Sequence, residues 1–324
     1  MKDKRITYSL ISVLMFCFLL PMTVNAQTYN IGVLMSFNRL GYKSAQTQFE
    51  RSLKEAGVQV NYRYENAGDD LETARSIIQS FKSDGVDLIH TYGTVATQAA
   101  AMEANDIPVL YSAVPTPVKS GIIDSMHATG SKITGTINAN PIAEQVDLFQ
   151  QIAPNAKVWG TIYNPDDEIS AHATEAARKE LESRGLTLKT ATVHSIRGHQ
   201  VGDAAVELLN KNIDVMFIIR DKTVASSMAA VIHRCEDKQV PVFSGNIFAV
   251  PLGAAAAMGF EYLEIGKSSA EKAEKILKDK EAIQSMYGGY ALDNFTIFIS
   301  PSNAKEQGVK SIPKNVLNAA DRVF

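Results

Sequence analysis

Short apolar runs alternate with amphipathic stretches along most of this chain. Each apolar run has the length of a buried strand, and each amphipathic stretch repeats its apolar residues at helical spacing. In the first part of the chain, this pattern predicts alternating strands and helices over Asn30–Ser36, Ser44–Ala56, Val58–Tyr64, Leu71–Ser83, Val86–Tyr92, Thr94–Ala104 and Ile107–Ser112. Strict alternation of this kind builds a parallel sheet with helices on both faces.

The same order of elements returns in the second part of the chain. It covers Lys157–Tyr163, Ser170–Ser183, Thr187–Val193, Val201–Asn210, Val215–Ile219, Val224–Lys238 and Val240–Ser244. The segment Ala254–Phe260, a helix over Leu263–Lys280, a strand over Tyr290–Ile299 and a helix after Pro313 lie outside this repeat. We expect this last part to cross back between the two halves.

Matched residues at nearly constant spacing indicate that the two halves are copies of one unit. Gly32 recurs as Gly160 and Gly57 as Gly185, both 128 positions later. Three further pairs follow in the same order at similar spacing: Asp87 with Asp214, Thr94–Ala96 with Thr223–Ala225, and Ile107–Val109 with Val240–Val242. A period of this length is close to one domain, so the pattern predicts two similar α/β lobes. Chance recurrence of generic strand and helix patterns is the alternative.

The N-terminus has the features of a secretory signal. Lys2, Lys4 and Arg5 precede an apolar run over Leu10–Leu20, and the small-residue motif Val24-Asn25-Ala26 follows. The run is shorter than the roughly 20 residues that span a bilayer, so we expect cleavage near Ala26 and export to the periplasm, with no membrane insertion of the mature chain. An uncleaved N-terminal anchor is the alternative interpretation.

Composition narrows the function further. Without residues 1–26 the chain has 29 basic and 34 acidic side chains, and such a balance argues against nucleic-acid binding. The sequence contains no Walker-type loop, no Gly-x-Ser-x-Gly and no His-Glu-x-x-His, so we expect neither an enzyme nor a cofactor. His194 and His199 stand five apart with no third ligand nearby, so we expect no metal site either.

Polar and aromatic residues follow the predicted strands, where ligands bind in open parallel sheets. The candidate ligand-binding residues are Phe37, Tyr92, Thr94, Ser112, Tyr163, Asn164, Arg220, Asp221, Lys222 and Asn246. Hydroxyls and helix-start amides near Thr94 and Ser112 suit a carboxylate, while Arg220 or Lys222 adds positive charge. We expect Asp221 to accept from an amino or hydroxyl group, and the three aromatic residues to line an apolar part of the ligand.

Each candidate also has a purely structural explanation. Thr94 could serve only as a helix cap, and residues 220–222 could form a surface charge cluster. Tyr92 and Tyr163 could be packing residues, and the acids at 166–168 are typical of a helix start.

Several longer segments resemble a known family. They are FERSLKEAG (49–57), VDLIHTYGTVATQAA (86–100), IPVLYSAVPTPV (107–118), IYNP (162–165), DKTVAS (221–226), VPVFSG (240–245), GAAAAMGFEYLEIG (253–266) and AKEQG (304–308). In this order, they are similar to the substrate-binding proteins of bacterial ABC importers, in the group that includes tryptophan- and other aromatic-amino-acid-binding members. The resemblance covers essentially the whole chain after residue 26.

The resemblance implies a periplasmic-binding-protein-like I fold, in which two doubly wound parallel-sheet lobes close on a ligand around a hinge of three crossovers. One lobe would take residues 27–138 and about 262–290, and the other 139–261 and about 291–324. A monomer that docks on a membrane permease is the expected form. In members of the family, the positions of Thr94, Ser112, Asn164 and Asp221 contact an amino-acid-like ligand.

The sequence departs from the family pattern at three places. The family often has His-Pro where this chain has Arg39-Leu40, Asn where it has Lys222, and Asp where it has Asn246. These changes predict a cleft that favours an anionic ligand. A ligand-sensing module for a receptor or histidine kinase would use the same fold and is the alternative role.

Overall fold

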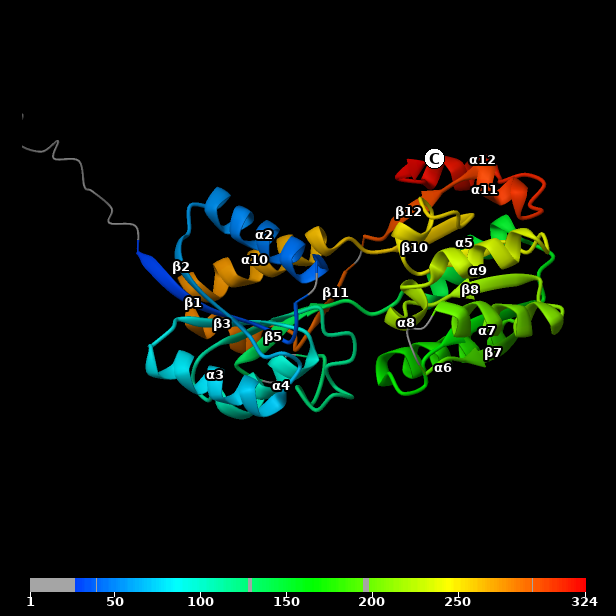
Figure 1. Cartoon of the computed structure of the whole chain (residues 1–324). Coiled ribbons are helices and arrows are strands. Elements are labelled where there is room, and N and C mark those ends of the chain that lie inside the picture. Colours follow the sequence, from blue (N-terminus) through cyan, green and yellow to red (C-terminus); the bar gives the residue numbers. More distant parts are fainter. Residues whose placement is uncertain (1–26, 39, 128–129, 195–197, 293) are drawn as a thin grey trace, which may run out of the picture.

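The protein folds into two α/β lobes that lie side by side (Figure 1). The computed structural model describes residues 27–324 except 39, 128–129, 195–197 and 293. The predicted signal sequence therefore lies outside the described residues. The two lobes confirm the fold class that the repeated pattern predicts.

The first lobe is built on a sheet with the strand order β11-β5-β4-β3-β1-β2, and its neighbouring strands are parallel. In chain order the strands are β1 (Thr28–Met35), β2 (Gln59–Asn66), β3 (Leu88–Tyr92), β4 (Val109–Ser112), β5 (Ile133–Ile137) and β11 (Tyr290–Ala291). Helices α2 (Leu40–Glu55) and α10 (Tyr262–Lys278) cover one face, followed by the short helix η2 (Lys280–Ser285). Helices α3 (Leu71–Ser83) and α4 (Thr94–Glu103) cover the other.

The second lobe has the strand order β13-β12-β10-β9-β8-β6-β7. Its strands are β6 (Val158–Tyr163), β7 (Thr187–Thr192), β8 (Val215–Ile218), β9 (Val242–Ser244), β10 (Ala256–Gly259), β12 (Thr296–Ile299) and β13 (Arg322–Val323), with β10 and β12 antiparallel. One face packs against α5 (Ile142–Ile152), α6 (Glu168–Ser183), α11 (Pro301–Glu306) and α12 (Lys314–Ala319). The other packs against α7 (Gly198–Asn210) and α9 (Met228–Glu236), while α8 (Lys222–Ala225) and η1 (Ile247–Ala249) follow strand ends.

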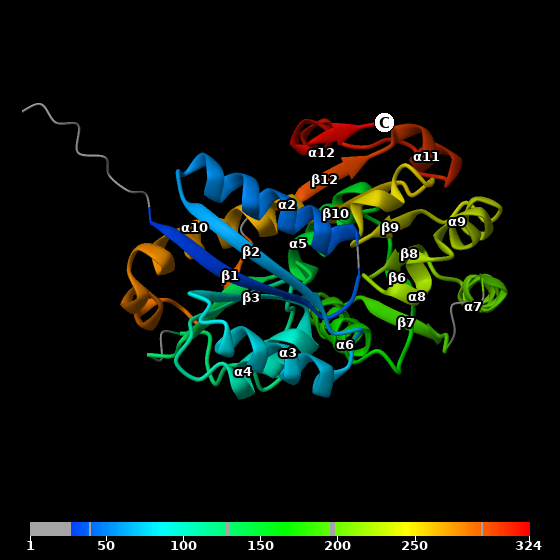
Figure 2. The same ribbon diagram turned by 60° about the vertical axis from the view of Figure 1, so that its left-hand side comes forward.

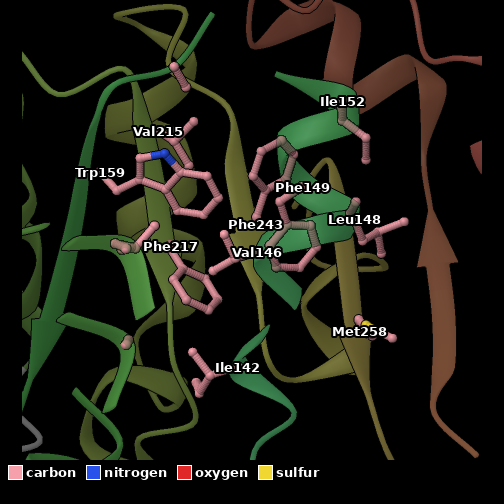
Figure 3. Packing of buried hydrophobic residues seen from close by; sticks show 14 of the residues in the cluster. Ile142, Val146, Leu148, Phe149, Ile152, Trp159, Val215, Phe217, Phe243 and Met258 are labelled. Carbon is pink, nitrogen blue, oxygen red and sulfur yellow. The ribbon is translucent and has the colours of Figure 1, made fainter. Parts of the chain in front are cut away.

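Aromatic side chains fill the core between the second sheet and α5 (Figure 3). Phe149 of α5 stacks on Phe243 of β9 with ring centroids 4.7 Å apart. Trp159 of β6 is fully buried and meets Phe217 of β8 edge to face at 5.7 Å. Trp159 is therefore a packing residue of this core, and it lies near the start of β6, away from the carboxyl end of that strand.

The strand orders confirm the internal duplication. The order β2-β1-β3-β4-β5 of the first sheet returns as β7-β6-β8-β9-β10 in the second. The two acids of a matched pair make equivalent hydrogen bonds. Asp87 accepts from the backbone N–H of Asn30, and Asp214 accepts from the backbone N–H groups of Lys157 and Val158. Each carboxylate therefore fixes the start of the first strand of its lobe.

The chain passes between the lobes at residues 138–141, at residues 260–261 and again between β11 and β12. The predicted strand over Tyr290–Ile299 is thus two short strands, β11 and β12, that belong to different sheets. The pattern also missed β5 and α5, which flank the first crossing. The predicted helix over Val224–Lys238 is divided into α8 and α9 at residues 226–227.

A buried hydrogen-bond chain joins the middle of the first sheet to α10. His90 Nε2 lies 2.8 Å from Ser112 Oγ, which is hydrogen-bonded with Ser269 Oγ at 2.7 Å. Ser269 in turn donates to Thr136 Oγ1 of β5. His90 is fully buried, and this burial lowers the pKa of its imidazole to about 3. The ring is therefore neutral in the folded protein at neutral pH.

We predict that His90 makes the protein sensitive to acid. The imidazole of a histidine in an unfolded chain has a pKa of about 6.5, so above that pH His90 does not change the free energy of unfolding. As the pH falls from about 6.5 toward 3, His90 becomes protonated in the unfolded chain but stays neutral in the folded chain. The free energy of unfolding should therefore drop by up to about 1.4 kcal/mol per pH unit. Urea denaturation at a series of pH values should show a shallower decline for His90→Gln.

The exposed His233 of α9 supplies the control, because His233→Gln alters no buried position. Equal pH slopes for the parent and His90→Gln would contradict the prediction.

Candidate functional site

A cavity of about 460 Å³ lies between the two lobes, a size typical of small-molecule sites. The first lobe contributes Phe37, Tyr42, Asp69, Thr94, Val95, Ala113, Pro115, Thr116, Lys119 and Ser120. The first crossing contributes Asn138 and Asn140, and the second lobe contributes Asp166, Asp167, Ser170, Ile218, Ile219, Arg220, Asp221, Lys222, Ala225, Met228, Ser244 and Asn246. Figures 1 and 2 show the two lobes that border this cavity from two directions.

The start of α4 forms the centre of the first wall. Gly93 precedes the helix at φ 87°, and a Cβ there would lie 2.7 Å from Tyr42 Oη and 2.8 Å from Ser36 Oγ, so only glycine fits. Ser36 Oγ accepts from the N–H of Ala96 at 3.0 Å. The first N–H groups of a helix have no partner inside it, so those of Thr94 and Val95 suit an anionic group in the cleft.

Asp221 organises the opposite wall. Its Oδ1 accepts from the N–H groups of Thr223 and Val224 at the start of α8, at 2.7 and 2.9 Å. Its Oδ2 accepts from the N–H of Asn164 at 2.8 Å and from Ser170 Oγ. Four protein donors thus occupy this buried carboxylate, which ties the end of β6 and the start of α6 to α8. In this arrangement Asp221 supports the wall and has little capacity left for a ligand.

Two more acids of this wall are paired with basic side chains. Asp167 lies 3.7 Å from Lys222 Nζ, and Asp166 lies 2.8 Å from His194 Nδ1. The positive charge that Lys222 brings to the cleft is therefore balanced locally. Of the other departures from the family pattern, Asn246 lines the cavity and caps η1 by accepting from Phe248, while Arg39 lies outside the described residues.

Arg220 holds the end of β8 against the hinge. Its guanidinium stacks over the ring of Phe260 with 4.2 Å to the centroid and donates to Tyr262 Oη at 3.1 Å. It also donates to the carbonyl of Asn138 at 3.4 Å. Asn138 belongs to the first crossing and Phe260 to the second, so Arg220 clamps both.

Aromatic rings form the apolar part of the cleft. Phe37 and Tyr42 have ring centroids 5.3 Å apart, and Tyr42 continues to Tyr262 at 6.1 Å. Phe37 remains half-exposed to the cavity, whereas Tyr42 is largely buried. The cleft therefore offers both an aromatic surface and polar groups.

Six of the ten candidate residues line the cavity: Phe37, Thr94, Arg220, Asp221, Lys222 and Asn246. The other four do not line it in this structure. Tyr92 and Ser112 are fully buried beneath the first wall, where Ser112 bonds with His90. Tyr163 ends β6 and Asn164 follows it, where Asn164 donates to Thr223 Oγ1. Contact of these residues with a ligand remains a prediction.

Sequence reasoning missed the contributions of two irregular segments. The long loop between β4 and β5 supplies Pro115, Thr116, Lys119 and Ser120, and the first crossing supplies Asn138 and Asn140. The length of that loop was the available signal, because long loops inside compact domains are uncommon and often form binding loops.

Within the described residues, no cluster of three or more metal-ligating side chains is present. In the same part of the chain, no helix has the length and apolar character needed to cross a membrane.

Comparison with known proteins places the chain in a family. Residues 30–324 match the model for ABC transporter substrate binding proteins. A tyrosine-binding protein of Clostridioides difficile (strain R20291) is 27% identical over 255 residues, which cover 78% of this chain and 73% of that protein.

Solved structures agree with the sequence comparison. The ligand-free, open structure of a substrate binding protein with adhesive properties from Clostridium difficile has a TM-score of 0.78 at 27% identity, covering 91% of this chain and 99% of that one. An ABC domain from Streptococcus pneumonia in complex with L-Trp has a TM-score of 0.73 at 23% identity, covering 91% of this chain and 100% of that one. Two lobes enclose a polar and aromatic cavity, and the chain belongs to the ABC transporter substrate binding protein family.

We predict that Asp221 is needed for the stability of the second lobe even without ligand. Asp221→Asn keeps one acceptor oxygen and leaves about two of the four donors unmatched, which should lower the free energy of unfolding by about 2–5 kcal/mol. Chemical denaturation of the ligand-free protein measures this loss.

Asp166→Asn is the matched control, because Asp166 is 68% exposed and its surface pair should contribute less than about 1 kcal/mol. A similar small loss in both variants would show that Asp221 does not support the wall.

Proposed function

We propose that this chain is the extracytoplasmic solute-binding protein of an ABC importer and captures a small polar organic ligand between its lobes. The ligand is amino-acid-like or carboxylate-bearing and has an aromatic part. The observation that carries the proposal is the cavity between the lobes, which combines helix-start amides, charged groups and an aromatic wall.

The ligand class follows from the two walls together. The N–H groups at the start of α4 suit a carboxylate, and Phe37 with Tyr42 suits a ring packed against them. The relatives support the same class, since one binds tyrosine and another holds L-Trp. We expect the protein to bind its ligand without catalysing a reaction, because most charged side chains of its cleft serve as helix caps or as members of ion pairs.

Capture would proceed by closure around the three crossings. A ligand bound to one wall gains further contacts when the second wall reaches it, and this difference in affinity shifts the population toward the closed form. Arg220 contacts both of the first two crossings, so it would keep the second wall attached to the hinge during this movement. The loaded, closed protein then delivers its ligand to the membrane permease.

We predict that the protein binds an aromatic amino acid and that Phe37 contributes to its affinity. A thermal-shift screen of amino acids and aromatic carboxylates, followed by calorimetry, should identify the ligand. Phe37→Ala removes an aromatic contact and should weaken its binding by about tenfold or more.

Val118→Ala is the control, because Val118 is exposed on the neighbouring loop and does not line the cavity. Undiminished affinity in Phe37→Ala, or no binding of any aromatic compound by the parent, would contradict the proposed site.

A further inference from the structure

Seven charged side chains line the cavity, and most of them are already used within the protein. The acids are Asp69, Asp166, Asp167 and Asp221, and the bases are Lys119, Arg220 and Lys222. Whichever of these charges has no protein partner is available to a ligand, so the pairing of each one indicates the charge pattern that the ligand must complement.

The five charged side chains that the second lobe contributes to the cavity all have protein partners. Asp221 accepts from four protein donors, and Asp166 is paired with His194. Asp167 and Lys222 are paired with each other, and Arg220 is held by the hinge. The second wall therefore presents few unmatched charges to a ligand.

The first lobe contributes one acidic and one basic side chain to the cavity, and their pairing differs from that of the second lobe. Within the part of the chain that the structure describes, neither Asp69 nor Lys119 forms a side-chain hydrogen bond or an ion pair, and both are exposed in the cleft. One unmatched negative charge and one unmatched positive charge thus stand on the same wall. A zwitterion complements this pattern, whereas a simple anion would leave Asp69 unmatched.

The backbone fixes the position of Asp69. The residue lies in the left-handed region at φ 64°, a conformation that costs free energy for any residue other than glycine and that occurs often at functional sites. Its N–H donates to the carbonyl of Ser36 at 2.5 Å. Because Ser36 Oγ also accepts from Ala96, Asp69 is connected to the first turn of α4 through a single residue.

Lys119 is attached to the same helix by another route. It precedes Ser120, whose carbonyl accepts from Gln98 Nε2 of α4 at 3.0 Å. Asp69 and Lys119 therefore both stand on segments docked against α4, at whose start the N–H groups of Thr94 and Val95 lie. These three features can contact the two charged groups of one small molecule.

We propose that Asp69 and Lys119 select a zwitterionic ligand: the Asp69 carboxylate receives its ammonium group, while Lys119 and the start of α4 receive its carboxylate. This inference rests on the proposed function and names the residues that determine its specificity. It also revises the expectation of an anionic ligand. The charge of Lys222 is balanced by Asp167, and the unpaired carboxylate of Asp69 favours a positively charged group on the ligand.

Calorimetry with matched ligand analogues tests the assignment. The probes are L-tyrosine and L-tryptophan, their deaminated forms, 3-(4-hydroxyphenyl)propionate and indole-3-propionate, and their decarboxylated forms, tyramine and tryptamine. The parent should bind one of the amino acids at least about 30-fold more tightly than either analogue, since each lost charge leaves a protein charge unmatched on closure.

The variants should change these ratios selectively. Asp69→Asn should reduce the preference over the deaminated analogue by about tenfold or more and leave the affinity for that analogue nearly unchanged. Lys119→Gln should reduce the preference over the decarboxylated analogue in the same way. Asp70→Asn and Lys132→Gln are the controls, because they remove equal charges of the first lobe from residues outside the cavity lining, and asparagine still caps α3.

The possible results distinguish a wrong assignment of Asp69 and Lys119 from a wrong ligand class. Unchanged ratios in Asp69→Asn and Lys119→Gln, with a parent that binds the amino acid, would overturn this inference and leave the proposed function standing. A parent that binds the deaminated analogue as tightly as the amino acid would also overturn it. A parent that binds neither amino acid would contradict the proposed ligand class and the inference together.

Discussion

The direction of the strands is the constraint on which the cleft depends. Neighbouring strands run parallel in the β1–β5 part of one sheet and the β6–β10 part of the other, so their carboxyl ends and the helix starts that follow gather at one edge of each sheet. The three crossings then hold those two edges against a common cavity. Helix-start amides and loop side chains face the same space because of this geometry, and no dedicated sequence motif is needed.

Charge pairing gives the two walls different roles. In the second lobe, Asp221 holds three segments together and Asp167 neutralises Lys222, so the charges mainly stabilise the wall itself. In the first lobe, a backbone hydrogen bond positions Asp69, and in the described ranges neither Asp69 nor Lys119 forms an ion pair. In the proposed closure, a ligand held by the unmatched charges of the first wall would meet a second wall whose own charges are already paired.

Much of the fold follows from local patterns in the sequence. Apolar runs and helical spacing predicted the alternation in both lobes, and the matched pairs Gly57 with Gly185 and Asp87 with Asp214 occupy equivalent places. The elements at the crossings were harder to predict, because β11 has only 2 residues and both β5 and β11 take their positions from pairing with other strands. Local propensity carries no information about which sheet such a strand will join.

The candidate site could be predicted only in part, for reasons of geometry. Residues directly after strands, such as Phe37 and Thr94, reach the cavity as expected. Ser112 is still within β4, where alternate side chains point to opposite faces, and it points into the lobe toward His90. Asp69 reaches the cavity through a left-handed turn, which a single sequence does not reveal.

Ligand-driven closure is the central claim, and small-angle X-ray scattering tests it most directly. The radius of gyration should fall when the amino acid found by calorimetry is added at saturating concentration, because the lobes approach one another across the cavity. A radius of gyration that stays unchanged while binding is saturated would contradict the account.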